Sequence, residues 1–400
     1  MSASTSTSTA ARRATRSAPA ELPPLKVCSI GMDWFPEAPG NGLDRMVYGL
    51  ALHFSETGLS GTTWVTGAPT HPNRPDSVRA FASPQASLPA RLRRARRLIG
   101  ADLARTDYDV LACHFALYGW PLPARDLPTV MHFHGPWALE SATEGGAAWR
   151  IRLKQTLERR MYRRADRFIV LSNAFREVLM RRYDVEGARI HVVPGGVDTN
   201  RFHAGMTTSA ARRALGWPTD RPIVLTVRRL AHRMGLFALL EAADRLRRLH
   251  SDVLVYIAGT GPLAAELQQR IVESGLEAHV QLLGFVPDAD LPLAYRAATY
   301  SVVPTTEWEG FGLTTIESLA SGTPVFVTPV GGLPEVVRPL SEALVLPDAS
   351  ANALYDALNE ALHGRQPLPD ASTCADYARD RFSWPRVVAA THHVYATACS

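Results

Sequence analysis

The chain has 400 residues, a hydrophobic content of 46% and a formal net charge of +5, which suits two globular domains with cores of their own. It contains no run of about 18 apolar residues, so no transmembrane helix is expected. The four cysteines are scattered without a C-x-x-C pair, which argues against a zinc site and a disulfide framework and favours a reducing, cytoplasmic compartment.

Residues 1–22 are rich in Ser, Thr, Ala and Arg and contain no acidic group before Glu21. Too few apolar side chains are present to offset the entropy of ordering, so the segment is predicted to be a disordered tail. An organelle transit peptide has a similar composition and stays open as an alternative. The apolar core of a secretory signal is missing.

The first α/β unit begins with a buried strand at residues 26–30, a loop at residues 39–42 and a helix near residues 44–54. Further strands are predicted at residues 109–114, 128–137, 166–172 and 190–198, with a helix after the third of them that ends near Tyr183. This alternation is typical of a doubly wound sheet, in which ligands bind at the carboxyl ends of the strands.

His132 and His134 alternate on one of these strands and therefore share a face. A pair of this kind can bind a metal ion. No third ligand is apparent in the sequence, so no metal site is predicted there.

Two basic amphipathic helices are predicted in the same half of the chain, at residues 88–106 and 149–167. Such helices can lie on anionic membranes, which would make the protein peripheral at the inner membrane face. A solvated arginine surface is the plainer interpretation and is favoured here, because arginine supplies almost all of the basic groups and the only lysines are Lys26 and Lys154.

The polar stretch at residues 203–221 is predicted to cross to a second α/β unit. Its strands are expected at residues 222–227, 253–258, 280–287, 300–304 and 343–347, and its helices up to about residue 249 and over about 350–363. Residues 381–385 then lead into a last helix. The alternation in both halves predicts two doubly wound domains that face each other across a cleft. The predicted division is a tail at 1–22, domains at 23–205 and 206–380, and a terminal helix at 381–400.

Asp288-Ala289-Asp290 matches the D-x-D pattern of metal-dependent transferases of another fold. Here it opens a predicted helix that runs to Ala298, where aspartates serve as caps and dipole partners. No metal site is predicted at this pattern either.

Gly259-Thr260-Gly261 follows a predicted strand and corresponds to half of a dinucleotide-binding fingerprint. The third glycine is absent, so the pattern is only a weak signal for NAD.

The segment from Glu307 to Leu333 has the properties of an anion site. Gly310 and Gly312 let the backbone turn sharply before a helix predicted over residues 313–320. The N-terminus of that helix favours phosphate. Glu309 and Glu317 flank it, and carboxylates accept hydrogen bonds from hydroxyl groups. A ligand with phosphates between two hydroxyl-bearing parts is a nucleotide sugar.

Glu309, seven residues and Glu317, with Gly-Phe-Gly-Leu between them, resemble the E-x7-E signature of the retaining glycosyltransferases of family 4, which have the GT-B fold. The resemblance implies that Glu309 contacts hydroxyls of the donor sugar and that Glu317 binds the ribose. It also implies that backbone amides hold the diphosphate, at Gly310, Phe311, Gly312, Leu313 and Thr314.

The resemblance extends to the segment from Arg228 to Gly235. The family has Gly-Arg-Leu and, after a short gap, Lys-Gly, and Arg229 matches its diphosphate-binding arginine. The family's glycine is Arg228 here, and its lysine is Met234, which cannot bind an anion. Arg233 is adjacent and is the candidate to replace that lysine.

Other family positions match in part. Gly40-Asn41-Gly42 corresponds to a Gly-Gly loop, so Gly42 is expected to face the diphosphate. His134-Gly135 resembles the His-Gly near the reaction centre, with His132 as the alternative. Gly259 and Gly261 are expected near the nucleoside, and backbone groups at Val286 near the base. The terminal helix is expected to cross back onto the N-terminal domain.

The implied activity is transfer of a hexosyl unit from a UDP- or GDP-sugar to an acceptor hydroxyl, with retention and without a metal or other cofactor. No protein nucleophile is apparent, so Arg229 and Arg233 with the helix amides would stabilise the leaving diphosphate. The expected acceptor is a carbohydrate, a lipid-linked molecule or a small molecule, and no nucleic acid is expected to bind. An epimerase or hydrolase acting on nucleotide sugars, and a non-catalytic sugar-nucleotide-binding protein, stay open.

Overall fold

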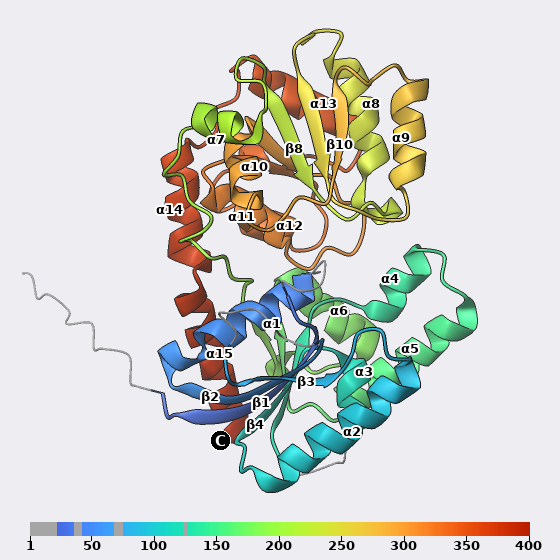
Figure 1. The fold of residues 1–400 in the computed structure, drawn as a ribbon, viewed down its shortest axis with the longest axis vertical. Coiled ribbons are helices and arrows are strands. Elements are labelled where there is room, and N and C mark those ends of the chain that lie inside the picture. Colours follow the sequence, from blue (N-terminus) through green and yellow to red (C-terminus); the bar gives the residue numbers. More distant parts are fainter. Residues whose placement is uncertain (1–21, 36–41, 68–74, 123–125) are drawn as a thin grey trace, which may run out of the picture.

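The computed structural model describes residues 22–35, 42–67, 75–122 and 126–400. Within them the chain forms two parallel sheets, each in its own α/β layer system, stacked along the long axis of the molecule (Figure 1). The predicted fold class is therefore confirmed. The disordered tail predicted for residues 1–22 falls outside the described part except for Leu22, and of the loop at 39–42 only Gly42 is described.

The N-terminal sheet has the strand order β3-β2-β1-β4-β5-β6-β7, with every pair parallel. Its strands are β1 (Leu25–Asp33), β2 (Leu59–Thr66), β3 (Val78–Ala82), β4 (Val110–Cys113), β5 (Thr129–Phe133), β6 (Arg167–Val170) and β7 (Ile190–Val192). Its helices are α1 (Gly42–His53), α2 (Leu88–Arg105), α3 (Ala116–Gly119), α4 (Trp137–Thr143), α5 (Ala148–Tyr162) and α6 (Asn173–Tyr183), with short 3₁₀ turns at Phe54–Thr57 and Gly187–Arg189.

The C-terminal sheet has the order β10-β9-β8-β11-β12, again parallel throughout. Its strands are β8 (Ile223–Val227), β9 (Leu254–Ala258), β10 (Val280–Gly284), β11 (Tyr300–Val303) and β12 (Val325–Val327). Its helices are α7 (Thr208–Leu215), α8 (Leu236–Leu246), α9 (Ala264–Glu273), α10 (Leu291–Ala297), α11 (Leu313–Ala320), α12 (Leu333–Val337), α13 (Ala351–Leu362) and α14 (Ala371–Phe382), with 3₁₀ turns η3 (His232–Met234) and η4 (Glu342–Leu344).

Each sheet reverses its strand order once, between β1 and β4 in the first and between β8 and β11 in the second. Crevices for ligands form outside the carboxyl ends of the strands at such a switch point. The strands at these positions are buried apolar runs, as both faces of a parallel sheet are covered by helices. A ligand-binding site is therefore expected near these two switch points.

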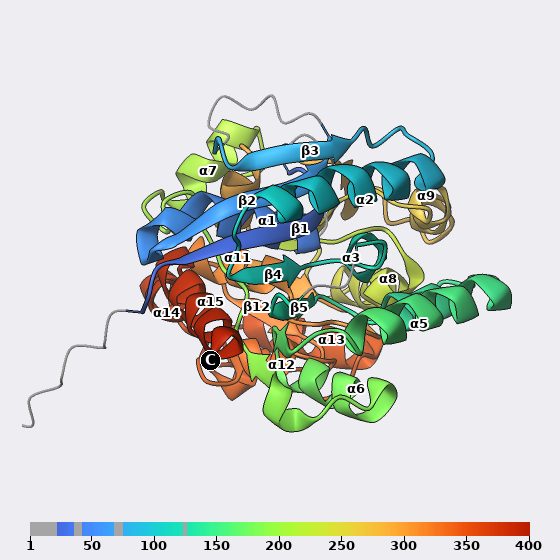
Figure 2. The ribbon, with the colours of Figure 1, turned by 90° about the horizontal axis from the view of Figure 1, so that it is seen from below.

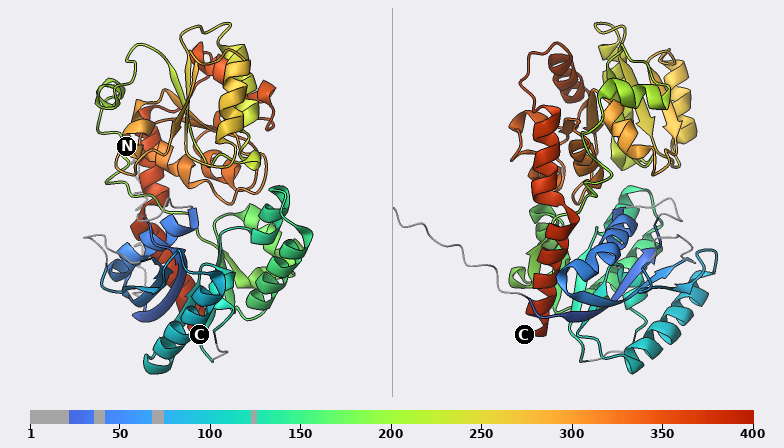
Figure 3. Two further views of the ribbon diagram at one scale, coloured as in Figure 1. Left: turned by 45° about the vertical axis from the view of Figure 1, so that its right-hand side comes forward. Right: turned by 60° about the vertical axis from the view of Figure 1, so that its left-hand side comes forward.

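The last helix, α15 (Trp384–Cys399), follows α14 and packs against α1 and the strands β4, β5 and β6 of the N-terminal domain. Figure 3 shows α14 and α15 together running alongside both domains. Trp384 fills space over Gly49, where an added Cβ would lie 1.9 Å from the indole. The chain therefore returns to the first domain at its end, while the boundary at 205/206 stays a prediction.

Several predicted elements differ from the observed ones. The basic helix α2 matches its predicted range, but α5 ends at Tyr162 because Arg167 already begins β6. In Figure 2, α5 projects from one side of the N-terminal domain and α15 lies toward the other. The strand predicted at 343–347 is wrong: residues 342–344 form η4, and only Val345 makes a bridge, to Val327. β2, β3 and α14 were not predicted.

Candidate functional site

The loop from β11 to α11 lies between the two domains and delivers the start of α11 there. Gly312, at the N-cap of α11, has a φ of 80°, a backbone conformation that residues other than glycine rarely adopt. An added Cβ on Gly310 would lie 2.6 Å from the Phe175 ring in α6 of the other domain. Gly332 donates to the Glu309 carbonyl at 2.9 Å. The loop is thus fixed from both sides, and the first amides of α11 have no partner within the helix.

Glu317 lies inside α11 and is buried, with both carboxylate oxygens engaged. Arg45 Nη1, from α1 of the N-terminal domain, lies 3.2 Å from Oε1, and the Tyr295 hydroxyl donates to Oε2 at 3.1 Å. Burial raises the pKa of the Glu317 carboxyl, and the nearby Arg45 charge opposes that rise. The sequence-predicted ribose acceptor is therefore also one end of an ion pair between the domains.

Asp288 is the second partner of Arg45, at 3.1 Å, and it also pairs with Arg201 at 2.5 Å. Asp290 occupies the N-cap position of α10, but its side chain makes no capping hydrogen bond. The predicted capping role of these aspartates is therefore wrong. Asp288 instead forms ion pairs with Arg45 of α1 and with Arg201 of the segment after β7. These pairs connect both segments to the start of α10.

Glu309 is paired with Arg228, the residue that replaces the family's glycine at the end of β8. The Arg228 guanidinium also donates to Thr305 Oγ1 at 2.6 Å and lies 3.0 Å from Met234 Sδ. Both side chains are largely buried, with exposed fractions of 8% for Arg228 and 14% for Glu309. The carboxylate predicted to contact the donor sugar is thus held by a guanidinium.

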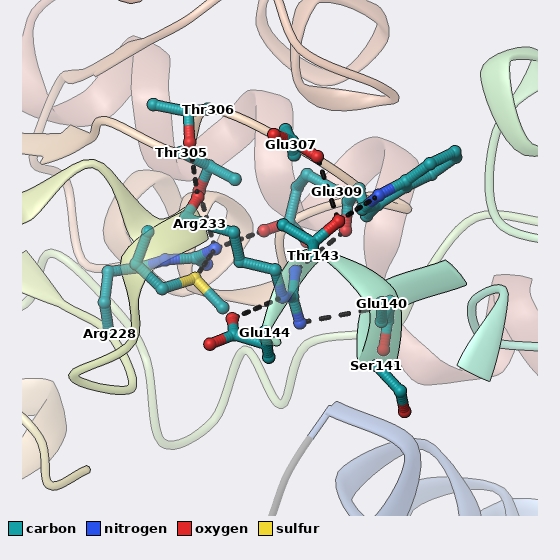
Figure 4. A network of polar contacts seen from close by, with 12 residues as sticks. Glu140, Ser141, Thr143, Glu144, Arg228, Arg233, Thr305, Thr306, Glu307 and Glu309 are labelled. Atoms are coloured by element: carbon teal, nitrogen blue, oxygen red, sulfur yellow. Dashed lines mark hydrogen bonds and ion pairs between the residues drawn. The ribbon is translucent and has the colours of Figure 1, made fainter. Parts of the chain in front are cut away.

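Arg233 reaches toward α4 of the N-terminal domain (Figure 4). Its Nη1 donates to the Trp308 carbonyl at 2.9 Å, and its guanidinium lies 3.9 Å from Glu140 and 3.7 Å from Glu144. Burial raises the pKa of Glu140, and the Arg233 charge opposes that rise. Arg229 next to β8 is exposed to solvent.

Thr143, at the end of α4, completes this contact between the domains. It donates to Glu307 Oε2 and accepts from the Trp308 indole, both at 3.0 Å. Sequence reasoning missed Thr143, Glu140, Glu144, Arg45 and Tyr295. No local pattern distinguishes them, because each acquires its role from a partner in another part of the chain.

The glycines predicted to lie near the donor each lie close to another part of the chain. Gly42 starts α1, and an added Cβ there would lie 3.7 Å from Leu313 at the start of α11. Gly259 has φ of 137° and faces the Arg228 carbonyl, where a Cβ would be 1.9 Å away. A Cβ on Gly261 would lie 2.3 Å from the Leu230 carbonyl. Val286 lies half-buried after β10.

His134 lies at the end of β5 beside two other imidazoles. His114 Nδ1 and His134 Nε2 are 3.1 Å apart, and the His114 and His132 rings stack with centroids 4.0 Å apart. His132 Nε2 lies 2.7 Å from the Tyr395 hydroxyl of α15. The expectation that His132 and His134 lack a third ligand is wrong, because β4 places His114 next to them.

These three histidines offer nitrogen atoms within 4.8 Å of one another, which makes them a candidate group for a metal ion. Burial lowers the pKa of all three imidazoles, that of His134 to about 4, so they are neutral at pH 7, as metal ligands must be. Their near-parallel rings, however, keep the nitrogen lone pairs in nearly parallel planes. Coordination would require at least one ring to rotate.

A separate cavity of about 540 Å³ lies at the carboxyl ends of β1, β2 and β3. Asp33 and Thr66 line its floor with polar groups, and Arg94 and Arg97 of α2 line its wall. It lies at the same edge of the sheet as His134 because all of the strands are parallel.

The part of the chain that the structure describes contains no helix long and apolar enough to cross a membrane.

Comparison with known proteins agrees with this architecture. Residues 40–201 match the family described as Glycosyltransferase Family 4, and residues 207–381 match Glycosyl transferases group 1. The D-inositol 3-phosphate glycosyltransferase of Mycolicibacterium smegmatis is 33% identical over 306 residues, which cover 73% of this chain and 68% of that protein. The mannosylfructose-phosphate synthase of Agrobacterium fabrum is 30% identical, over 56% of this chain and 51% of its own length.

Solved structures show the same fold. The sucrose-phosphate synthase of Thermosynechococcus elongatus superposes with a TM-score of 0.75 at 23% identity, over 94% of this chain and 98% of that one. The Anabaena protein HepE in complex with UDP-glucose superposes with a TM-score of 0.70 at 19% identity, over 93% of this chain and 99% of its own.

Proposed function

The chain belongs to the family 4, group 1 glycosyltransferases, and on that premise we propose that it moves a hexosyl unit from a UDP- or GDP-sugar to an acceptor hydroxyl, with retention and without a metal. The observation that carries the proposal is the placement of Glu309 and Glu317 on either side of the first turn of α11. Free amides between two carboxylates match a diphosphate between a sugar and a ribose.

Within this proposal the donor binds mainly to the C-terminal domain. Glu317 accepts from the ribose, Glu309 accepts from the donor sugar, and the amides from Gly310 to Thr314 hold the diphosphate. Arg229 is exposed and therefore open to a phosphate from solvent. Positive groups act mainly on the departing diphosphate, because negative charge accumulates there as the glycosidic bond breaks. His134 stands near the sugar as a neutral hydrogen-bonding group.

The proposed reaction is a front-side transfer in which the leaving diphosphate helps to deprotonate the acceptor hydroxyl. A double displacement would need a protein carboxylate free to attack the sugar. Glu309 is the carboxylate proposed to contact the sugar, and its ion pair with Arg228 makes it a poor nucleophile. The pairing therefore supports the front-side course.

The acceptor is proposed to be a phosphorylated polyol or sugar bound in the cavity at the ends of β1–β3. Arg94 and Arg97 are three residues apart on α2, so they share a helix face and suit a phosphate group. The inositol phosphate, mannosylfructose-phosphate and sucrose-phosphate enzymes are each named after a phosphorylated compound. Arg97→Gln should weaken binding of myo-inositol phosphate or fructose phosphate and leave UDP or GDP binding unchanged.

Peripheral membrane contact is proposed only for α5. Trp149 and Leu153 lie one turn apart on this helix with exposed fractions of 64% and 53%, and Arg150 and Arg152 adjoin them. Apolar and basic groups together suit an anionic lipid surface. Co-sedimentation with phosphatidylglycerol vesicles, lost in Trp149→Ala, would support the contact, and equal sedimentation of both proteins would oppose it.

A thermal-shift screen with UDP, GDP and ADP tests the donor assignment. A ligand that binds only the folded state raises the unfolding temperature, and the rise grows with ligand concentration. We expect one nucleoside diphosphate to stabilise the protein and Glu317→Ala to abolish most of the shift. No shift with any of the three would contradict the proposal.

A further inference from the structure

Arg228 is a buried cation whose hydrogen-bonding capacity is only partly used. Its contacts with Glu309, Thr305 and Met234 all come from one nitrogen, Nη2. Its Nε is buried and has no hydrogen-bond partner among the described residues. A guanidinium carries five N–H donors, and an unsatisfied buried donor is unfavourable. An unpartnered donor of this cation therefore lies beside the loop that contains Glu309.

The Arg228 guanidinium lies beside Met234, at the position where the resembled family has a lysine. The sequence has arginine at 228 and methionine at 234, where the resembled pattern has glycine and lysine. The Met234 sulfur, a weak acceptor, lies 3.0 Å from Arg228 Nη2. A positive charge therefore lies beside position 234 although the lysine of the resembled pattern is missing there.

Arg233 is engaged in a different direction. It donates to the Trp308 carbonyl and faces Glu140 and Glu144 from the N-terminal domain. Two carboxylates thus surround it, whereas Arg228 faces the single carboxylate of Glu309. Figure 4 shows the Arg233 guanidinium between Glu140 and Glu144, with Arg228 beside Thr305. Arg233 therefore serves the contact between the domains.

We propose that Arg228, rather than Arg233, is the second cation of the donor site and binds the diphosphate together with Arg229. This assignment rests on the proposed function. Arg228 Nη2 holds Glu309, and the donor assigned to a phosphoryl oxygen is Nε, which has no hydrogen-bond partner among the described residues. As the glycosidic bond breaks, the same contact stabilises the charge on the leaving group.

The test compares binding of nucleoside diphosphates and monophosphates by calorimetry, using UDP with UMP and GDP with GMP. These probes carry no hexosyl group, so the role of Glu309 toward the donor sugar does not enter. Arg228→Gln should weaken diphosphate binding by about tenfold to a hundredfold, the loss expected for a charged hydrogen bond, and monophosphate binding by less than about threefold. The matched variants Arg233→Gln and Glu309→Gln should keep the diphosphate preference.

Moving the positive charge from position 228 to position 234 tests whether the diphosphate preference can be restored. Arg228→Gly should lose the diphosphate preference, and Arg228→Gly with Met234→Lys should regain it, because an ammonium then stands where the guanidinium ended. Met234→Lys alone adds a second cation beside Arg228 and should not raise affinity further. If Arg228→Gln does not fold, the double variant decides, since it retains one cation.

Unchanged diphosphate preference in Arg228→Gln would overturn the assignment alone, whether or not Arg233→Gln loses that preference. A double variant that folds without the preference would also overturn it. If the unmodified protein binds no nucleoside diphosphate, the proposed function fails, and the assignment fails with it.

Discussion

Arg45 and Glu317 are 272 residues apart in the sequence, and their Nη1 and Oε1 atoms lie 3.2 Å apart across the two domains. The Tyr295 hydroxyl holds the other oxygen of Glu317 at 3.1 Å. A ribose that binds to this carboxylate must therefore replace or share one of these partners. Donor binding and the Arg45 contact are expected to be coupled for that reason.

The coupling predicts a pH-dependent effect of Arg45→Ala. Burial raises the pKa of Glu317 and Arg45 opposes the rise, so the variant should raise this pKa further. Above that pKa, loss of the competing arginine should strengthen nucleotide binding severalfold. Below it, the carboxyl is protonated and binding should weaken, starting at a higher pH than in the unmodified protein. Calorimetric titrations from pH 8 to pH 5 measure nucleotide affinity, with Arg45→Lys as control. The affinity profiles of Arg45→Ala and the unmodified protein against pH should cross, and parallel profiles would contradict the coupling.

Glu317→Ala should weaken binding of the nucleoside diphosphate by about 1–3 kcal/mol, because the ribose hydroxyls lose a charged acceptor. Calorimetry with UDP and GDP measures the loss. Unchanged affinity would show that the ribose role is misassigned. Glu335→Ala is a suitable control, since Glu335 accepts backbone hydrogen bonds from Asn173 and Ala174 on the surface.

Activity should survive exhaustive treatment with EDTA. The His114, His132 and His134 rings are stacked. All three are hydrogen-bonded, His114 to His134 and His132 to Tyr395, so no preformed coordination geometry is present among them. Complete loss of activity, restored by Mg²⁺, Mn²⁺ or Zn²⁺, would mean that a metal is required. His114→Ala would then show whether these histidines hold it.

Glu158 should make the stability of the protein depend on pH. It is fully buried and accepts from the Tyr183 hydroxyl at 2.9 Å, and burial raises its pKa from an ordinary 4.5 to about 7. The folded state therefore binds the proton more tightly than the unfolded chain. The resulting stabilisation is complete below about pH 4.5, declines as the pH rises to about 7 and is lost above it, in total about 3 kcal/mol.

Glu158→Gln removes this titration. Relative to the unmodified protein, its free energy of unfolding should improve by up to about 3 kcal/mol between pH 4.5 and pH 8. Urea denaturation at both pH values measures the difference. The exposed Glu177 on α6 provides the control, because Glu177→Gln should show no such change. A constant difference between Glu158→Gln and the unmodified protein would refute the role of Glu158.

Local patterns were sufficient for much of the fold. The helix predicted at residues 313–320 coincides with α11, because a glycine loop precedes it and its apolar residues follow a helical period. The range of α2 was also predicted closely, since Ala95, Ile99 and Leu103 form one buried stripe. α14 was missed, although Asp370 caps it by accepting from the Thr373 amide. It ends at Phe382, where the chain becomes extended and Ser383 forms a bridge with Val197.

The pairings in the site could not be predicted in the same way. The sequence identifies Glu309 and Glu317 by their spacing, but their partners Arg228 and Arg45 come from another strand end and another domain. His114 joins His134 only because the strand order places β4 beside β5. Such contacts depend on how the sheets and domains are assembled, which the periodicity of the sequence does not determine.

The most direct measurement is product analysis after incubation with a sugar-labelled UDP-glucose or GDP-mannose and phosphorylated polyol or sugar acceptors. We predict that the labelled sugar appears on an acceptor hydroxyl with the anomeric configuration of the donor, and that release of the nucleoside diphosphate requires the acceptor. Three results would contradict glycosyl transfer. The label could be found in an isomerised donor, it could be released as free sugar whether or not an acceptor is present, or it could stay in the unchanged donor with every donor and acceptor tested.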